Sequence, residues 1–270
     1  MQKPFSEHAQ NIDRFFTAIK SLNEYDKMEI RGVVAGLLYP PLRDTYFTLN
    51  YHRAAINIEL VLTLTDTRQF QAIAMLARTI FESAVEIKLI TAIPDSVDKI
   101  RTFTELEKLR AAKKIVKFKK AHPDAKVLIE TYEEFIAKNE ESILHERDAM
   151  WPGPGKITHW SRMNLAESTE LLGKPFNEIY QINYAQLSWY VHSGIVGVAN
   201  LGATTFALLA GVAFNIAMES YMEILTAIID EFKIIKADPK LKDKMMLAKM
   251  LPFTDTPEEA NRLQRAFLGS

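Results

Sequence analysis

Two segments far apart in the chain carry polar side chains whose spacing could support acid–base chemistry. Arg78 and Glu82 lie four residues apart in an otherwise apolar segment, and Tyr184, Ser188 and His192 recur at the same interval in an uncharged segment. Side chains four residues apart share one face of an α-helix. Each polar stripe could supply the hydrogen-bond partners of the other. We therefore expect these five side chains to cluster.

This cluster has two interpretations, and both stay open. In the functional one, His192 transfers a proton, Glu82 orients it or acts as its base partner, and Arg78 holds an anion or phosphate. The residues that would bind the ligand in that case are Tyr184, Ser188 and Tyr190. In the structural interpretation the same side chains form a satisfied buried network that sets the register of two helices.

Residues 151–162 combine large aromatic, imidazole and cationic side chains with two prolines and two glycines, which excludes regular structure there. Loops that hold large aromatics either bind something or cover a core. Trp151, His159 and Trp160 are therefore candidate ligand-binding residues in a lid over the cluster. The alternative is plain packing of the two tryptophans.

Residues 108–120 contain seven Lys and Arg and no acidic residue, whereas residues 130–148 are rich in Glu. Folded back about a turn at 121–124, the acidic segment would place Glu130 to Glu134 opposite residues 111–115 and neutralise most of this charge. Four lysines at the tip would remain as a contact for nucleic acid or an acidic partner: Lys117, Lys119, Lys120 and Lys126. The alternative is a solvated charged hairpin.

The elements that position these residues are predicted to be helices. Only 10 Gly and 11 Pro occur in 270 residues, and no segment alternates long enough to predict a strand. The predicted helices and breaks are a helix over 67–91, an antiparallel pair over about 95–120 and 124–148, helix starts at Asn164 and Thr256, and a break near Asn200–Gly202.

We expect an all-α fold, a multi-helix bundle with a central apolar helix pair within 176–236 and no significant sheet. The chain is 48% hydrophobic and 25% charged, as globular domains are. One domain over 1–270 is expected, with 1–65 as a candidate N-terminal helical subregion.

The central stretch 179–218 contains no Asp, Glu, Lys or Arg. Its part 194–217 is long enough to cross a ~30 Å hydrocarbon core. Polar residues such as Asn200 and Asn215 interrupt it, and no Lys or Arg anchors its downstream end. We favour a buried core helix and keep membrane association through 194–217 as the alternative.

The charge, the composition and the absence of certain motifs argue against several function classes. The net charge of -1 provides no global attraction to nucleic acid or anionic lipid, and the absence of Cys excludes thiol nucleophiles and Cys-ligated metals. No P-loop or dinucleotide-binding fingerprint occurs, and Glu141, His145 and Asp148 are interpreted as a solvated helix face. We expect no metal and no cofactor. Without an apolar segment behind the first lysine, a cytoplasmic location is expected.

The residues Ala77-Arg78, Glu82, His159-Trp160, Tyr184 and Leu187 to Ser193 resemble an uncharacterised bacterial family classed as a domain of unknown function, over roughly residues 45–230. That family's helical make-up in turn is similar to HEPN-like domains, several of which are metal-independent endoribonucleases. In those an Arg and a His lie four to six residues apart on one helix, and in this chain no Arg is followed by a His at that distance. The resemblance implies an all-α architecture and a site at Arg78, Glu82 and His192.

The function expected from the sequence is a ligand- or partner-binding helical module in bacterial stress or defence. Its partner would be a small molecule, a protein or RNA, and the protein would form a homo-oligomer. The alternative is a metal-independent ribonuclease or other hydrolase, in which His192 transfers the proton and Arg78 stabilises the developing negative charge.

Overall fold

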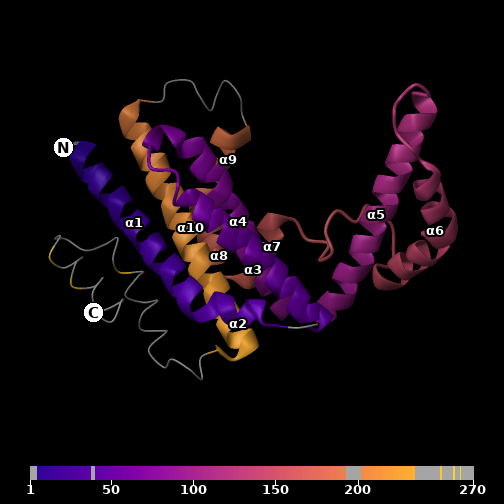
Figure 1. Ribbon diagram of the computed structural model, residues 1–270, viewed down its shortest axis with the longest axis horizontal. Coiled ribbons are helices and arrows are strands. Elements are labelled where there is room, and N and C mark those ends of the chain that lie inside the picture. The colour runs from indigo at the N-terminus through magenta and orange to yellow at the C-terminus, as the bar shows by residue number, and fades with distance from the viewer. Residues whose placement is uncertain are drawn as a thin grey trace. The chain divides into compact units, whose positions relative to one another are not determined.

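The computed structural model is helical, and the residues that it describes include no strand (Figure 1). It describes residues 5–37, 40–192, 202–234, 250, 258 and 262, with the backbone alone for 5–11, 189, 192, 203 and 204. The α-helices are α1 (Phe5–Tyr25), α2 (Arg31–Ala35), α3 (Leu42–Val61), α4 (Phe70–Ala92), α5 (Ser96–Ala121), α6 (Glu130–Met150), α7 (Leu165–Leu172), α8 (Phe176–Glu178), α9 (Ala185–His192) and α10 (Ala203–Phe232). The π-helices η1 (Asp26–Ile30) and η3 (Ile179–Tyr184) and the 3-10 turn η2 (Thr67–Gln69) connect some of them. The predicted all-α fold is confirmed.

The chain divides into two compact units. The first, here called the bundle unit, comprises residues 1–88 and 165–270, and the second, the hairpin unit, comprises residues 89–164. Each is described by itself below. The expectation of one domain over 1–270 stays a prediction.

Helix α10 is largely buried in the bundle unit, and α1 and α3 pack against it (Figure 1). Its Ala210, Ala213, Ala217, Tyr221 and Ile228 have no exposed surface. It begins directly after Gly202, in agreement with the predicted break. A helix that is apolar on most of its circumference is stable only when neighbours cover it, so this position follows from its composition.

The membrane alternative concerns the same helix. The window Thr205–Phe232 is long and apolar enough to cross a membrane, and 67% of it is buried inside the structure. Core helices of soluble proteins meet the same criterion. Residues 193–201, which begin the predicted 194–217 segment, lie outside the described residues.

Helix α4 positions Arg78 and Glu82 and corresponds to the predicted helix over 67–91. Asp66 forms a capping box, because its side chain accepts the Arg68 N–H and Gln69 bonds back to the Asp66 N–H. One apolar face of α4, including Ile73, is buried.

Helices α5 and α6 form the predicted antiparallel pair of the hairpin unit, but in a different register. Lys113 pairs with Glu140, and Lys120 pairs with Glu133 at 3.0 Å. The expected pairing of Glu130 to Glu134 with residues 111–115 is therefore wrong. The cause is the connection, because residues 122–129 are not helical and α6 begins at Glu130 instead of near Asp124.

The loop after α6 packs into the hairpin unit. Trp151 and Ile157 join Leu106, Leu109 and Ile143 in one buried apolar cluster. Gly153 and Gly155 adopt φ of 101° and 136°, backbone conformations that favour glycine. The loop is thus held by its own apolar side chains, as the packing alternative expected for Trp151.

Candidate functional site

The structure brings Arg78, Glu82 and Tyr184 together inside the bundle unit. Arg78 Nη2 donates to the Tyr184 hydroxyl at 2.9 Å, and that hydroxyl donates to Glu82 Oε1 at 2.7 Å. The direct distance between Arg78 Nη2 and Glu82 Oε1 is 3.9 Å. The phenol therefore connects the two charges, and these three of the five predicted cluster residues meet.

Tyr184 is the last residue of η3 and is 7% exposed. Its ring stacks on Tyr180 with centroids 5.4 Å apart, and the Arg78 guanidinium lies 4.7 Å from its centroid. Burial and the hydrogen bond to Glu82 raise the pKa of Tyr184 to about 12. At neutral pH this group is a proton donor to Glu82, not a base.

The remaining predicted members lie nearby along the chain. Ser188 is half-buried in α9, and Tyr190 packs edge-on against Phe70 at 5.7 Å. The backbone of His192 ends α9, and its side chain lies outside the described residues. The catalytic role of His192, Arg78 and Glu82 therefore stays a prediction.

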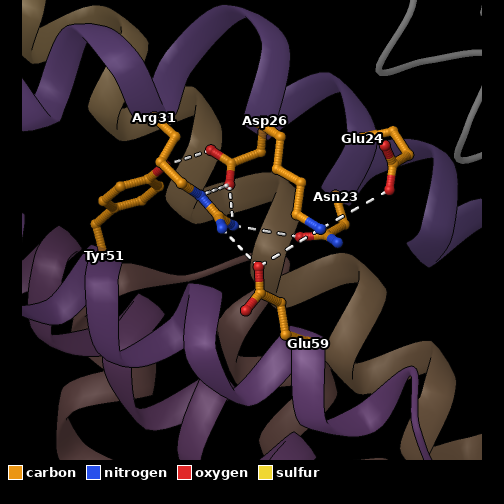
Figure 2. Close-up of polar contacts among 7 residues, drawn as sticks. Asn23, Glu24, Asp26, Arg31, Tyr51 and Glu59 are labelled. Atoms are coloured by element: carbon orange, nitrogen blue, oxygen red, sulfur yellow. Dashed lines mark hydrogen bonds and ion pairs between the residues drawn. The ribbon is translucent and has the colours of Figure 1, made fainter.

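A second polar cluster, which the sequence analysis missed, lies between η1 and α3 in the bundle unit (Figure 2). Asp26 is fully buried and accepts hydrogen bonds from Arg31 Nη2 at 2.8 Å and from the Tyr51 hydroxyl. Arg31 Nη1 reaches Glu59 Oε1 at 2.5 Å, and Arg31 Nη2 reaches Asn23 Oδ1 at 3.3 Å. One guanidinium thus holds three acceptors.

The electrostatics of this cluster follow from its burial. Burial and the Asp26 carboxylate raise the pKa of both Tyr51 and Tyr221 above the usual value, so both phenols stay protonated. The hydrogen bond from Arg31 lowers the pKa of Glu59. The arrangement places the buried Asp26 side chain beside two neutral phenols.

The π-helix explains why sequence spacing did not reveal this cluster. Asp26 and Arg31 are five residues apart, and such residues do not share a face of an α-helix. In η1 the Arg31 N–H bonds to the Asp26 carbonyl, which closes an i→i+5 turn and brings the two side chains together. The sequence contains no local pattern that predicts this π-helical turn.

The hairpin unit contains a pocket of about 670 Å³ with mostly cationic walls, here called the lysine groove. Five of its lining residues are basic: Arg110, Lys113, Lys114, Lys117 and Lys156. The others are Glu107, Ala111 and Thr158. The four basic residues of α5 lie at i, i+3, i+4 and i+7, which places them on one helix face.

The partners of these cations differ. Arg110 pairs with Glu107 and donates to the Ile157 carbonyl at 2.6 Å, and Lys113 pairs with Glu140. Lys114, Lys117 and Lys156 have no ion pair or hydrogen bond within the described chain.

Lys156 enters the groove because of its neighbour. Ile157 inserts into the apolar cluster, so the residues on either side of it, Lys156 and Thr158, face the pocket.

The four lysines predicted at the hairpin tip are separated by the structure. Lys117 lines the groove, whereas Lys119 donates to the carbonyls of Pro123 and Ala125 at 2.5 and 2.6 Å and closes the connection to α6. Lys120 pairs with Glu133. Lys126 is exposed and has no ion pair among the described residues.

The aromatic residues of the 151–162 loop are largely covered within the hairpin unit. Trp151 and Trp160 are buried, and His159 Nδ1 lies 2.7 Å from the Ser161 hydroxyl. The ring centroids of His159 and Phe103 are 6.3 Å apart. Their ligand-binding role stays a prediction.

No group of three metal-ligating side chains comes together within the described ranges. Helix α6 carries Glu141, His145 and Asp148, the face interpreted as solvated. Arg147 pairs with Asp148 at 2.5 Å.

Comparison with known proteins gives one match. A family model described as a family of unknown function (DUF5677) matches residues 46–204. This range spans α4, the hairpin unit and Tyr184, and it confirms the resemblance to an uncharacterised family. Neither the curated proteins nor the solved structures include a match to the chain.

Proposed function

From the premise that the chain belongs to a family of unknown function (DUF5677), we propose that the protein is a helical binding module that holds single-stranded nucleic acid in the lysine groove. The observation that carries this proposal is the set of three unpaired cations, Lys114, Lys117 and Lys156, that face one pocket within the described hairpin unit. Unpaired lysines directed at one groove attract phosphate groups.

The groove has dimensions that suit a short stretch of backbone. Arg110 and Lys117 are separated by about 10 Å along α5 at 1.5 Å per residue. That distance accommodates a short stretch of single-stranded backbone. The pocket volume of about 670 Å³ lies in the range of sites that enclose part of a ligand.

An exposed aromatic pair favours nucleic acid over an acidic peptide. Phe118 is 50% exposed and stacks on His122 with ring centroids 4.5 Å apart. Phe118 follows Lys114 by four residues, so both side chains occupy one side of α5. Single-stranded nucleic acid is bound by cationic grooves with aromatic surfaces on which bases stack.

The location, assembly and biological role that we propose for the protein come from the sequence. We propose a cytoplasmic homo-oligomer with a role in bacterial stress or defence, and RNA is the preferred form of the ligand. The alternative that the sequence offers is a metal-independent ribonuclease or other hydrolase that uses His192 and Arg78. Retained cleavage by His192→Ala would exclude it.

The binding test uses fluorescence anisotropy with labelled single strands of about twelve nucleotides, one RNA and one DNA. The variant is the double substitution Lys114→Gln and Lys117→Gln. Its matched control is Lys138→Gln, which neutralises an exposed lysine on α6 outside the groove. We expect at least about a tenfold loss of affinity for the double variant and none for the control.

Salt dependence provides the second readout. With three phosphate contacts, the logarithm of the association constant should fall with the logarithm of salt concentration with a slope of about -2. The double variant should reduce that slope to about -1. Equal affinity of wild type and variant, or binding of ATP or polyglutamate with no binding of the oligonucleotides, would overturn the proposal.

A further inference from the structure

A second pocket, of about 390 Å³, lies in the bundle unit beside the Asp26–Arg31 cluster. Its apolar walls are Phe16 and Leu62, and its polar residues include Lys20, Asn23 and Glu59. They come from α1, α3 and the residue that follows α3. The lysine groove belongs to the other unit, so this pocket is independent of the proposed function.

Asn23 is the most informative residue of this pocket because it is only 2% exposed. Arg31 carries donors only, so the amide must present its oxygen to Arg31 Nη2, 3.3 Å away. Figure 2 shows this contact on one side of the amide. The nitrogen then remains for the pocket, and it has no acceptor among the described residues. This nitrogen is therefore a donor that a ligand in the pocket can use.

The lysine ammonium groups of the pocket can donate further hydrogen bonds. Lys20 is exposed and has no ion pair in the described part of the chain. Lys27 lies 3.9 Å from Glu24 and 3.6 Å from Glu59, longer than hydrogen bonds. Glu59 Oε1 is already held by Arg31 at 2.5 Å. The pocket thus offers hydrogen-bond donors from Asn23, Lys20 and Lys27 beside two apolar walls, and the carboxylates of Glu24 and Glu59 also line it.

We propose that this pocket binds a small organic carboxylate with an aliphatic or aromatic body. The carboxylate accepts hydrogen bonds from Asn23 Nδ2 and from the ammonium groups of Lys20 and Lys27, and the body packs on Phe16 and Leu62. Glu24 and Glu59 also line the pocket, so a doubly charged phosphate would be repelled more than a singly charged carboxylate.

The experiment measures binding of hexanoate and phenylacetate to the full chain by calorimetry and by ligand-observed NMR. For molecules of this size we expect a Kd of about 1 mM. Phenethylamine and inorganic phosphate are the comparison probes, because the first reverses the charge of phenylacetate and the second lacks an apolar body. Both should bind at least about ten times more weakly.

Asn23→Asp is the decisive variant. It keeps an acceptor oxygen for Arg31 and replaces the donor nitrogen by an acceptor, so folding is retained while the carboxylate is repelled. We expect at least about a tenfold loss of affinity. Asn57→Asp makes the same chemical change on α3 outside the pocket, where the amide bonds to the Arg53 carbonyl, and should leave affinity unchanged.

Lys20→Gln provides a second variant that does not touch the buried cluster, and a severalfold loss is expected. The absence of carboxylate binding to wild type, stronger binding of phenethylamine, or unchanged affinity in both variants would overturn this proposal. None of these results bears on the lysine groove, whose test uses residues of the hairpin unit.

Discussion

The Tyr184 hydroxyl donates a hydrogen bond of 2.7 Å to Glu82, a residue 102 positions earlier in the chain. The same oxygen accepts from Arg78 at 2.9 Å, while the two charged groups stay 3.9 Å apart. A neutral phenol therefore connects a cation and an anion of α4 to η3. This contact ties the central segment of the chain to α4.

Removing that hydroxyl should weaken the fold. Tyr184→Phe keeps the ring packing but leaves Arg78 and Glu82 without their shared partner, and we expect the free energy of unfolding to fall by about 1–3 kcal/mol. Urea denaturation followed by circular dichroism measures it. Tyr180→Phe is the matched control, because Tyr180 stacks on Tyr184 and its hydroxyl makes no hydrogen bond in the described structure. Equal loss in both variants would contradict a role for the hydroxyl.

The Tyr184 phenol should also produce an alkaline dependence of stability. Its pKa is raised to about 12 in the folded protein, compared with about 10 in an unfolded chain. The stabilisation is complete below pH 10 and is lost as pH rises through about 12, because the unfolded chain releases the proton first. Unfolding measured across this interval in wild type and Tyr184→Phe gives the difference. A variant with the same alkaline slope as wild type would refute the assignment.

Arg31 should be essential as long as Asp26 keeps its charge. Arg31→Met leaves a fully buried carboxylate without its cation, and we expect a loss of about 3–5 kcal/mol in the free energy of unfolding.

Adding Asp26→Asn removes that stranded charge and should recover at least about 1 kcal/mol. Thermal and urea denaturation of the single and double variants test the coupling. Additive losses would show that the two residues act independently.

Ile157 should affect nucleic-acid binding in the lysine groove by positioning Lys156. Ile157→Ala removes a buried side chain from the apolar cluster, at a cost of about 2–4 kcal/mol in the free energy of unfolding. Because this residue anchors Lys156, affinity for single-stranded nucleic acid should fall although no charge is lost. Val116→Ala, at a buried position of α5 outside that cluster, is the control for stability alone. Unchanged affinity in Ile157→Ala would show that the loop does not position the groove.

The helices themselves could be predicted because their signals are local. The helix start after Asp66 and the break at Gly202 depend on residues close in sequence, and both occur as expected. The register of α5 against α6 could not be predicted. It depends on how many residues the connection uses, and the non-helical stretch 122–129 is longer than the predicted turn.

The candidate sites also differ in how far the sequence could predict them. Arg78, Glu82 and Tyr184 could be grouped because α-helical spacing places each polar stripe on one face. The Asp26–Arg31 pair could not, because the π-turn η1 changes which residues share a face. Lys156 joins Lys114 and Lys117 through the burial of Ile157.

The sequence by itself determined that the chain is helical, that the segment of α10 is apolar and uncharged over most of its length, and that α4 carries a polar pair on an apolar face. These properties follow from composition and period, which act within one helix. Only the tertiary structure decided which charges remain unpaired and which side chains line a pocket. Pairing depends on the register and packing between segments far apart in sequence, and no periodicity within one segment encodes them.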